Sequence, residues 1–469
     1  MNRRMFLSAT PAMLGAGALS AAETRPQAPA VTRPRATFGD VVEPDWEQRV
    51  KISVGPGKAD LVGADHRAIQ AAVDYVAGLG GGTVQILPGT YRFRNAVKLR
   101  SGVRIVGSGL DSVCIKEPSV KTPLLENSDW YDREVTLTDP SGFEVGDGVV
   151  LVTRNPHNGS FDTYKRTLIA RSGNRFKLDE MLVENFWTKE NASASTLFAL
   201  FDGYRIADAA IENICLDGNR SNNESLNGNY VGCIFLRESN RIQMRQVTAR
   251  NFNGDGISWQ VCHDVRVEDC HSHDNAGFAL HPGSGSQRTV VTGSTLERND
   301  IGFFFCWGVK YSLAENNTCT GNRVGISIGH RDTDNLVRKN TIANSTGVGI
   351  LFRPERGPSF CAHRNRIEDN KVVNSGDMSG IAIDVQGGTE QVAIVGNTIQ
   401  ETRAPASRIG RKFAWNRISL PGLQRTWNSS RGECLLRRNF SRRGAEIAEE
   451  KQGGFPSTSP QMPSIPEGT

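Results

Sequence analysis

The chain has 469 residues, enough for two or three average domains or for one long repeat domain. Hydrophobic residues make up 38% and charged residues 22%, which excludes a disordered chain and allows a large core. The 49 glycines exceed the average share and favour a turn-rich β protein over a helical bundle. The net charge of +5 comes from the ends, because residues 401–469 hold twelve Lys or Arg against six Asp or Glu. The body of the chain therefore offers no basic surface for nucleic acid.

Residues 1–22 have the layout of a secretory signal peptide, with a basic start, a short apolar centre and small residues at Ser20-Ala21-Ala22. The run Arg3-Arg4-Met5-Phe6-Leu7 resembles the bacterial twin-arginine export signal, which implies a periplasmic or secreted protein. Residues 23–45 are rich in proline and are expected to form a linker. No later stretch is long and apolar enough to predict a membrane span.

Nine cysteines are spread along the chain without the close pairs that zinc sites need. Most of them lie in strand-like patterns, where a buried thiol packs as a small apolar group. Export would permit disulfides, but the spacing requires none.

From about residue 230, a unit of glycine, apolar residue, any residue and apolar residue recurs every 21 to 31 residues. A fixed period with strand-like alternation predicts a solenoid of short stacked strands. A second strand in each unit ends in a polar or small residue, and asparagines there, such as Asn317 and Asn340, can hydrogen-bond along a column. We therefore predict an all-β fold, a right-handed parallel β-helix. The glycines expected to lie in one file are Gly256, Gly277, Gly302, Gly325 and Gly349.

The N-terminal part of the body carries two further motifs. Asp65 opens a short amphipathic helix, and Gly80-Gly81-Gly82-Thr83-Val84 follows it as a strand. These motifs resemble the start of the pectate-lyase superfamily of right-handed parallel β-helix proteins. The resemblance implies that the helix caps the open end of the solenoid and that the glycine-rich strand begins the first coil. His66 departs from the pattern, which has a second Asp at that place.

The resemblance covers residues 60–115 and 205–400. It implies a protein that acts on polysaccharides by elimination, hydrolysis or epimerisation, or a phage tail protein or adhesin. Changes of pattern then divide the chain. The expected parts are a cap with first coils at 46–119, a small β insertion at 120–205, the parallel β-helix at 206–400 and a disordered or irregular tail at 401–469.

Side chains of a strand alternate between the two faces of a sheet, so the glycine alignment also predicts an outward column. In that alignment the column reads Leu236, Gln260, His281, Cys306, Gly329, Arg353 and Asp384. Coils stack about 4.8 Å apart, which places His281 and Arg353 on the order of 14 Å apart. Because the residues between them are small, the column predicts a notch with room for a sugar ring.

A lyase or epimerase removes the proton next to a uronate carboxylate, which needs a base and neutralising cations. We predict that His281 or His330 is the base and that Arg353 neutralises the carboxylate. Glu355 is a further catalytic candidate, and Trp307 is a candidate sugar platform. The remaining candidates for substrate binding are Gln260, His263, Arg331, Asp332 and Asp384. Any one of these residues is equally well explained as ordinary solvated surface.

Two other functions remain open. A glycoside hydrolase needs two carboxylates about 5–5.5 Å or 6.5–9.5 Å apart, for which Glu355 with Asp384 or with Asp332 are candidates. The clustered aspartates expected of pectin hydrolases of this fold are missing, which favours the lyase or epimerase. The third function is a non-catalytic glycan-binding or surface protein.

The expected partner is a polysaccharide, with no nucleic acid, and the expected state is a monomer. No cofactor is firmly implied. The turn His330-Arg331-Asp332-Thr333-Asp334-Asn335 could either hold an ion such as Ca2+ or close on itself through Asx turns.

Overall fold

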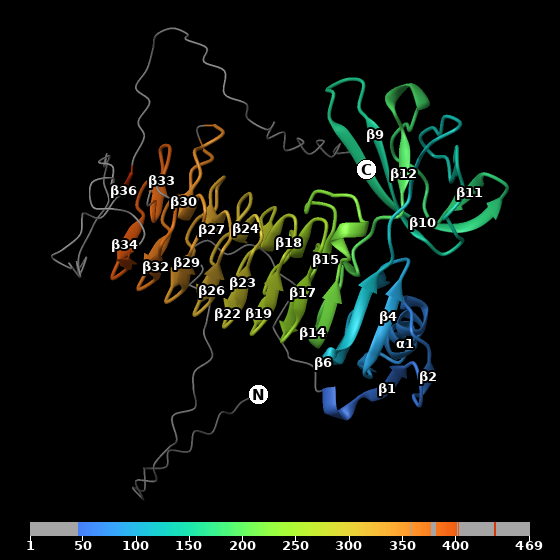
Figure 1. The fold of residues 1–469 in the computed structure, drawn as a ribbon, viewed down its shortest axis with the longest axis horizontal. Helices are drawn as coiled ribbons and strands as arrows, with labels where there is room; N and C mark the ends of the chain where they lie inside the picture. The colour runs from blue at the N-terminus through green and yellow to red at the C-terminus, as the bar shows by residue number, and fades with distance from the viewer. Residues whose placement is uncertain (1–45, 358, 377–380, 401, 403–435, 438–469) are drawn as a thin grey trace, which may run out of the picture.

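The computed structural model describes residues 46–357, 359–376, 381–400, 402 and 436–437. The expected signal peptide, the linker at 23–45 and nearly all of the tail at 401–469 lie outside the described residues. The described chain is a long stack of parallel strands with a helix at its N-terminal end and a small β unit beside the first coils (Figure 1). The predicted fold class, a parallel β-helix with a capping helix and a β insertion, is therefore confirmed.

A ten-stranded sheet forms the face of the solenoid on which the predicted site lies. Its neighbouring strands pair in parallel, one coil to the next. In chain order its strands are β5 (Val97–Lys98), β13 (Phe201–Tyr204), β15 (Gly232–Arg237), β18 (Asp255–Gln260), β21 (Phe278–Gly283), β24 (Ile301–Phe304), β27 (Val324–Ile328), β30 (Val348–Phe352), β33 (Ile383–Val385) and β36 (Leu436–Arg437).

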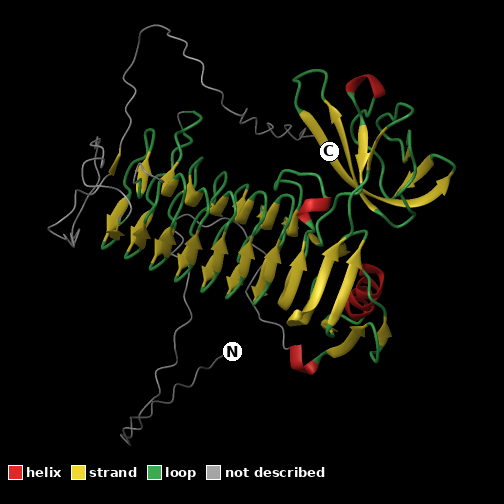
Figure 2. Cartoon of the chain, in the orientation of Figure 1, coloured by secondary structure: helices red, strands yellow, loops and turns green. Residues whose placement is uncertain are grey.

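A twenty-stranded sheet forms the other long face, with two rows of short strands from β16 onward (Figure 2). It begins with β1 (Val50–Gly55), β2 (Leu61–Val62), β3 (Gly82–Ile86), β4 (Gly89–Phe93), β6 (Val103–Lys116) and β14 (Ala207–Asp217). One row holds β16 (Asn240–Arg245), β19 (Arg266–Glu268), β22 (Val290–Thr292), β25 (Leu313–Glu315), β28 (Leu336–Arg338), β31 (Arg366–Glu368) and β34 (Ala393–Val395). The other holds β17 (Thr248–Arg250), β20 (His271–His273), β23 (Thr295–Glu297), β26 (Thr318–Thr320), β29 (Thr341–Ala343), β32 (Lys371–Val373) and β35 (Thr398–Gln400).

The chain turns between strands through residues in the left-handed backbone conformation, and many of these are not glycine. One file of such residues, at or just beyond the ends of the ten-stranded sheet's strands, has φ angles of 46° to 66°. This strand-end corner consists of Arg205, Glu238, Val261, Ser284, Trp307 and His330. Left-handed backbone costs a residue with a Cβ about 1 kcal/mol or more, so its repetition shows that coil stacking dictates the conformation.

A second file of left-handed residues alternates in charge along the axis except at Tyr311. This charged corner consists of Asp208, Arg241, Asp264, Arg288, Tyr311, Asp334 and Arg364. Ion pairs between coils join Arg241 to Asp208, Arg288 to Asp264 and Arg364 to Asp334, with N–O distances of 2.7 to 2.8 Å. Each pair is therefore a contact between neighbouring coils rather than within one turn.

Buried asparagines join the coils along the axis, as the sequence predicted. The backbone N–H of Ser294 donates to Oδ1 of Asn317 at 3.0 Å, and that of Asn317 donates to Asn340 at 2.9 Å. The ladder continues through Asn370 and Asn397. Each side chain satisfies a backbone donor that is buried in a turn, where no strand partner is available.

The helix α1 (His66–Gly78) covers the N-terminal end of the solenoid (Figure 2). Asp65 caps it by accepting two backbone N–H groups of the first turn at 3.0 and 3.1 Å. Past its end, Gly81 has φ of 109°, and a Cβ there would lie 2.2 Å from the carbonyl oxygen of Gly102. Only glycine therefore fits where the chain enters the first coil. The face that the helix buries consists of His66, Ile69, Ala72, Val73 and Val76.

The β insertion is an antiparallel sheet with its own core. Its strands are β7 (Lys121–Pro123), β8 (Glu134–Thr136), β9 (Gly148–Arg154), β10 (Phe161–Ser172), β11 (Arg175–Leu178) and β12 (Ser193–Ser195). Phe176 and Phe186 are among its fully buried side chains. Arg94 binds Asp147 through Nε at 2.8 Å and Nη2 at 2.7 Å, which fixes the insertion to the first coils.

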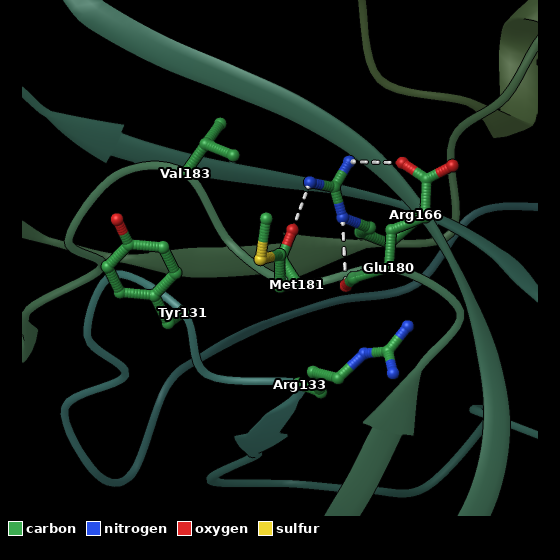
Figure 3. A pocket seen from close by; sticks show the side chains of 6 residues that line it. All are labelled: Tyr131, Arg133, Arg166, Glu180, Met181 and Val183. Atoms are coloured by element: carbon green, nitrogen blue, oxygen red, sulfur yellow. Dashed lines mark hydrogen bonds and ion pairs between the residues drawn. The ribbon is translucent and has the colours of Figure 1, made fainter.

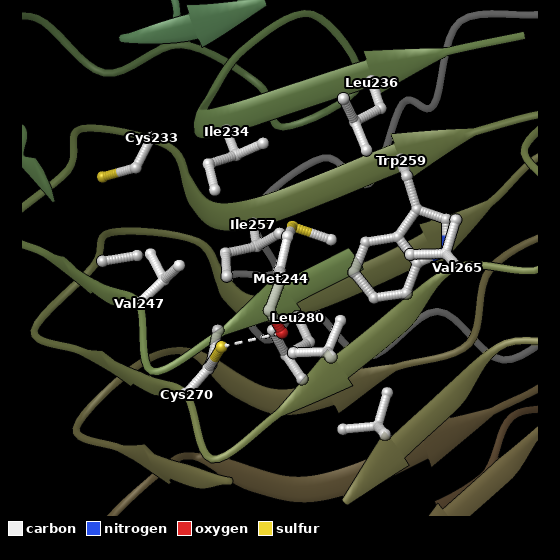
Figure 4. Packing of buried hydrophobic residues seen from close by; sticks show 14 of the residues in the cluster. Cys233, Ile234, Leu236, Met244, Val247, Ile257, Trp259, Val265, Cys270 and Leu280 are labelled. Carbon is white, nitrogen blue, oxygen red and sulfur yellow. Dashed lines mark hydrogen bonds between the residues drawn. The ribbon is translucent and has the colours of Figure 1, made fainter. Parts of the chain in front are cut away.

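The interior of the solenoid is one continuous apolar core (Figure 4). Ile234, Ile257 and Leu280 follow one another in register through three coils. Trp259 is fully buried, as expected from its inward position. The described cysteines are free thiols, and all but Cys306 are buried, so they pack as apolar groups.

The predicted file of glycines is wrong at Gly277. Ile257 pairs with Leu280, which sets Ala279 rather than Gly277 beside Gly256. Gly277 instead lies beside Asp255, where a Cβ would come within 2.3 Å of the carboxylate. The correction moves His281 by two positions along its strand and therefore changes its neighbours on the outer face.

Candidate functional site

Two columns of side chains occupy the outer face of the ten-stranded sheet. The registers of the paired strands define them. The first column reads Asp202, Phe235, Ser258, His281, Phe304, Ser327, Leu351 and Asp384. The second column reads Tyr204, Arg237, Gln260, Gly283, Cys306, Gly329, Arg353 and Gln386. His281 and Arg353 thus lie in different columns, and not in the single column predicted. Leu236, which the sequence placed outward, belongs to the core.

His281 and Asp255 form a buried pair. Nδ1 of His281 lies 2.6 Å from Oδ2 of Asp255, and both side chains are 2% exposed. Burial lowers the pKa of His281, but the charge and hydrogen bond of Asp255, with a contribution from Cys306, outweigh it and raise the pKa to about 9. The imidazole is therefore a cation at neutral pH. This state does not suit the expected role of base, and it suits the stabilisation of negative charge.

Two phenylalanines cover His281. The rings of Phe278 and Phe304 meet the imidazole edge-on, with centroids 5.2 and 5.1 Å away. The two phenylalanine rings also contact each other, with centroids 4.2 Å apart. A ligand on this face would therefore meet the aromatic cover before it met the imidazole.

Arg353 does not border an open notch, because its side chain fills the space above Gly329. It reaches back over two coils, where Nη1 donates to Oγ of Ser327 and Nη2 donates to the carbonyl oxygen of Phe305, both at 2.7 Å. Its guanidinium lies 4.2 Å from the centroid of the Phe304 ring. A Cβ on Gly329 would lie 2.9 Å from Cβ of Arg353. The side chain of Arg353, which was expected to border the predicted notch, therefore fills it.

Trp307 and His330 occupy consecutive coils of the strand-end corner and stack with centroids 5.7 Å apart and planes at 9°. Trp307 is 40% exposed, so part of its ring is open to a ligand. The guanidinium of Arg356 lies 5.8 Å from the Trp307 ring. Burial, followed by the charges of Arg353 and Arg356, lowers the pKa of His330 to about 4. The imidazole is therefore neutral at neutral pH and can accept a proton.

Arg331 and Phe360 extend this group. Arg331 donates to the carbonyl oxygen of Ser359 at 3.2 Å and to its hydroxyl at 3.0 Å. Its guanidinium lies 3.9 Å from the Phe360 ring, which meets Trp307 edge-on at 5.2 Å. We call this group the Trp307 cluster. Its members are Trp307, His330, Arg331, Arg356 and Phe360.

Asp332, expected to bind substrate, faces the inside of its turn and is fully buried. Its carboxylate accepts three backbone N–H groups at 2.8 to 2.9 Å, from Gly308, Val309 and Gly329. Burial raises the pKa of Asp332 to about 7, against the charge of Arg353 and these donors. Gly308 and Val309 belong to the preceding coil, so the carboxylate joins two coils and is not presented to a ligand.

Asp384 and Glu355 are also engaged within the protein. Gln386 donates to Oδ2 of Asp384 at 2.7 Å, and Oε2 of Glu355 accepts the N–H of Gly388 at 2.7 Å. Asp384 lies in the column of His281, four coils and about 19 Å further along. The structure therefore separates Asp384 from the first predicted catalytic residue.

Gln260 and His263 lie apart from the Trp307 cluster. Gln260 is buried, and its side chain donates to Oγ of Ser258 at 3.2 Å. It lies over Gly283, where an added Cβ would come within 2.3 Å of the Gln260 side chain. The backbone of His263 forms isolated β-bridges with Asn240 and Gln287, just before Asp264 of the charged corner. His263 therefore does not share an outer column with His281.

Asp255 and Arg356 are the residues that sequence reasoning missed. A signal for Asp255 was present in the glycines around it. A Cβ on Gly228 would lie 1.8 Å from its carboxylate, and one on Gly277 would lie 2.3 Å away. These glycines make room for a buried carboxylate. Arg356 lies in an irregular loop, where no column could place it.

Residues 195–308 and 232–404 match the family model described as the right handed beta helix region. The described chain folds as a right-handed parallel β-helix. This is the fold that the resemblance of the capping helix and the glycine-rich strand implied.

Solved structures similar to this β-helix protein come from several sources. The tailspike of Pseudomonas phage phi297 aligns at 15% identity over 72% of this chain and 63% of its own, with a TM-score of 0.39. The A-module of a mannuronan C-5 epimerase from Azotobacter vinelandii aligns at 14% identity over 76% and 94%, with a TM-score of 0.40. A periplasmic alginate epimerase aligns at 12% identity over 67% and 61%, with a TM-score of 0.36. The chain thus spans less than two thirds of that tailspike's length, and no curated protein matches the sequence.

A hollow of about 470 Å3 opens on the insertion of the β-helix protein, away from the predicted site residues (Figure 3). Arg166, at its edge, donates to the carbonyl oxygens of Glu180 at 3.2 Å and Met181 at 2.5 Å. Its guanidinium is therefore committed to the fold of the insertion. The lining residues are Tyr131, Arg133, Arg166, Glu180, Met181 and Val183.

Two further features of the β-helix protein bear on its ligands. Across the described ranges, no group of three or more His, Cys, Asp or Glu side chains is arranged to hold a metal ion. In the same part of the chain, no helix has the length and hydropathy to cross a membrane.

Proposed function

We propose that this β-helix protein is exported and acts on an acidic polysaccharide, as a lyase or uronate epimerase, at the Trp307 cluster. The observation that carries the proposal is a neutral imidazole, His330, stacked on an exposed tryptophan and flanked by arginines. An aromatic face binds the apolar face of a sugar ring, and arginine binds carboxylates. The cluster therefore combines a sugar platform, cations for a uronate and a base.

The reaction begins with transfer of the proton next to the uronate carboxylate to the imidazole of His330. Negative charge then develops on the carboxylate, where Arg331 and Arg356 are the cations on the surface of the cluster. In a lyase the electron pair expels the glycosidic oxygen, which takes up the proton from the imidazolium of His330, and an unsaturated sugar is left. In an epimerase water donates a proton to the opposite face of the same carbon, and His330 returns its proton to the solvent.

The buried groups below the cluster have a different role in this proposal. Phe304 touches both the guanidinium of Arg353 and the imidazole of His281. Burial first, and then the charges of Arg353 and Arg356, lower the pKa of His330 and keep it neutral. Arg353 and His281 are therefore positioning residues rather than groups that touch the substrate. The role of base falls to His330, which was one of the two residues predicted for it.

The test uses purified protein with a panel of polyuronates and neutral polysaccharides. Lyase activity gives unsaturated products that absorb in the ultraviolet, and epimerase activity changes the proton NMR spectrum of a polyuronate without shortening it. We expect one of these signals on an acidic polymer only. New reducing ends without ultraviolet absorbance, or products from a neutral polymer, would show a hydrolase instead.

A non-catalytic glycan-binding protein is the second candidate, because the predicted notch is filled and His281 is covered. This function predicts binding of polyuronate at the Trp307 cluster with no product on any substrate. A hydrolase has less support, since Asp332 faces into its turn.

Export rests on the twin-arginine resemblance of residues 1–22. Replacing Arg3 and Arg4 by Lys is expected to leave the precursor in the cytoplasm. Normal processing of that variant in a bacterial host would instead indicate the general secretory route.

A further inference from the structure

A second group of aromatic and basic side chains lies on the same corner of the solenoid as the Trp307 cluster. Tyr204 ends β13 and is 45% exposed. The guanidinium of Arg237 lies 4.2 Å from its ring and that of Arg205 lies 4.8 Å away. The two arginines come from consecutive coils, so the stacking of the coils places both against one ring.

The charge of this group is positive. Glu238 binds Arg205 at 2.7 Å and lies 3.6 Å from Arg237, so one carboxylate serves two guanidinium groups. Each arginine is more than half exposed, which leaves N–H donors open to a ligand.

A neighbouring pair of lysines adds to the positive charge. Lys98 binds Asp202 at 2.6 Å and Lys165 binds it at 3.2 Å. Although burial alone would raise it, these two cations hold the pKa of Asp202 well below its usual range. Lys165 also lies 4.0 Å from the Phe235 ring. The first coils thus repeat, with different residues, the aromatic and basic chemistry of the Trp307 cluster.

The distance between the two groups follows from the register. Tyr204 pairs with Arg237, Arg237 with Gln260 and Gln260 with Gly283, and Gly283 bridges to Cys306. Four coil spacings therefore separate Tyr204 from the coil of Trp307, which is about 19 Å. The corner residues between the two groups, Val261 and Ser284, carry no charge.

We propose that Tyr204, Arg205 and Arg237 form a second subsite for an acidic polysaccharide, so that one chain lies along the strand-end corner and reaches both groups. The proposal rests on the proposed function, because it assigns the same class of ligand to both places. It predicts that affinity rises with chain length once an oligouronate exceeds about 19 Å.

The test measures binding of size-fractionated oligouronates by calorimetry to the wild type, Tyr204→Ala and the double variant Arg205→Gln with Arg237→Gln. We expect both variants to lose about tenfold in affinity for long oligomers and none for short ones. Arg298→Gln is the matched control, because Arg298 is equally exposed and paired with an aspartate at another corner. It should bind long oligomers like the wild type.

Several results would overturn the proposal. Equal affinity of the variants and the wild type for long oligomers would show that the polymer does not reach Tyr204, while wild-type binding would leave the proposed function standing. Failure of the wild type to bind any oligouronate would contradict the proposed function itself. Equal competition by dextran sulfate or by single-stranded DNA would show a general polyanion surface instead of a polysaccharide subsite.

Discussion

Two files of residues run along the solenoid axis, and one repeats the same residue type while the other changes from coil to coil. In the asparagine ladder, Asn317, Asn340, Asn370 and Asn397 make the same hydrogen bond in coil after coil. On the outer face, the column through His281 changes at every coil, from serine to histidine to phenylalanine and back to serine. Repetition in the ladder serves the stack as a whole. Variation in the column lets each coil present a different group, and we place the chemistry on the adjoining strand-end corner, at Trp307 and His330.

The two files also differ in what a single side chain does. The side chain of a ladder asparagine accepts a buried backbone N–H of the preceding coil, so its loss leaves that donor buried without an acceptor. In the Trp307 cluster Arg331 and Arg356 are exposed and Trp307 is partly exposed, whereas His330 is buried. We therefore expect substitutions in the asparagine ladder to lower stability and substitutions in the Trp307 cluster to lower activity.

The largest expected effect is on catalysis at His330. His330→Gln removes the proposed base while keeping a side chain that can hydrogen-bond, and we expect turnover to fall about a thousandfold. The melting temperature should change by less than about 2 °C. His271→Gln, on the outer surface of the twenty-stranded sheet, is the control and should leave turnover unchanged. Normal turnover of His330→Gln on a confirmed substrate would remove the base from the proposed mechanism.

The next effect is a dependence of stability on pH. The pKa of His281 is raised from its usual 6.5 to about 9 in the folded protein. The folded state therefore holds a proton that the unfolded state has lost between these values, and the stabilisation present below pH 6.5 is lost as pH rises to about 9. We expect the contribution of His281 to the free energy of unfolding to fall by about 3 kcal/mol across this range, against an opposite contribution from Lys116, whose pKa burial lowers to about 7.

Denaturant unfolding at a series of pH values measures this change. In Asp255→Asn the charge that raises the pKa of His281 is gone, so the fall that His281 contributes should disappear while the opposite contribution of Lys116 remains. An equal slope in the variant and the wild type would assign the dependence to other groups.

A smaller effect is expected in the ladder. Asn340→Ala leaves the N–H of Asn317 without its acceptor and should lower the free energy of unfolding by about 2 kcal/mol. Turnover of the folded variant should match the wild type. Thr318→Ala, an exposed substitution on the neighbouring coil, should change stability by less than about 0.5 kcal/mol. Equal losses of stability in the two variants would show that the ladder hydrogen bond contributes no more than an exposed side chain.

The smallest effect is expected at Gly329. The notch predicted from the sequence would accept a leucine there, but in the structure the leucine must displace Arg353. We expect Gly329→Leu to cost about 1 to 2 kcal/mol of stability. Gly57→Leu, where a Cβ meets nothing, should be neutral. An unchanged melting temperature for Gly329→Leu would show that Arg353 can leave its place without cost.

The sequence was sufficient to predict the fold because the period and the alternation of apolar residues repeat many times. The register was predicted less well, and the reason is physical. A shift of two residues keeps every side chain on its own face, so hydropathy cannot distinguish Gly277 from Ala279 as the partner of Gly256. That ambiguity was enough to place His281 in the wrong column.

The candidate site was predicted in part. Trp307, His330 and Arg331 were singled out from the turns, and the structure brings them together. The conformation of Arg353 could not be predicted, because a long side chain can either border a space or fill it. Asp255 was missed because its role depends on contacts with a histidine in the next coil.

The charged corner has a consequence for how the chain assembles. Coils of such similar shape and apolar content could stack in the wrong order, since a skipped coil would still bury its leucines and valines. Along this corner, however, omitting the coil of Arg241 would bring Asp208 against Asp264, and omitting that of Asp264 would bring two arginines together. The charges on this corner therefore disfavour a stack that lacks the coil of Arg241 or of Asp264, but not one that lacks the coil of Tyr311, where Arg288 would meet Asp334.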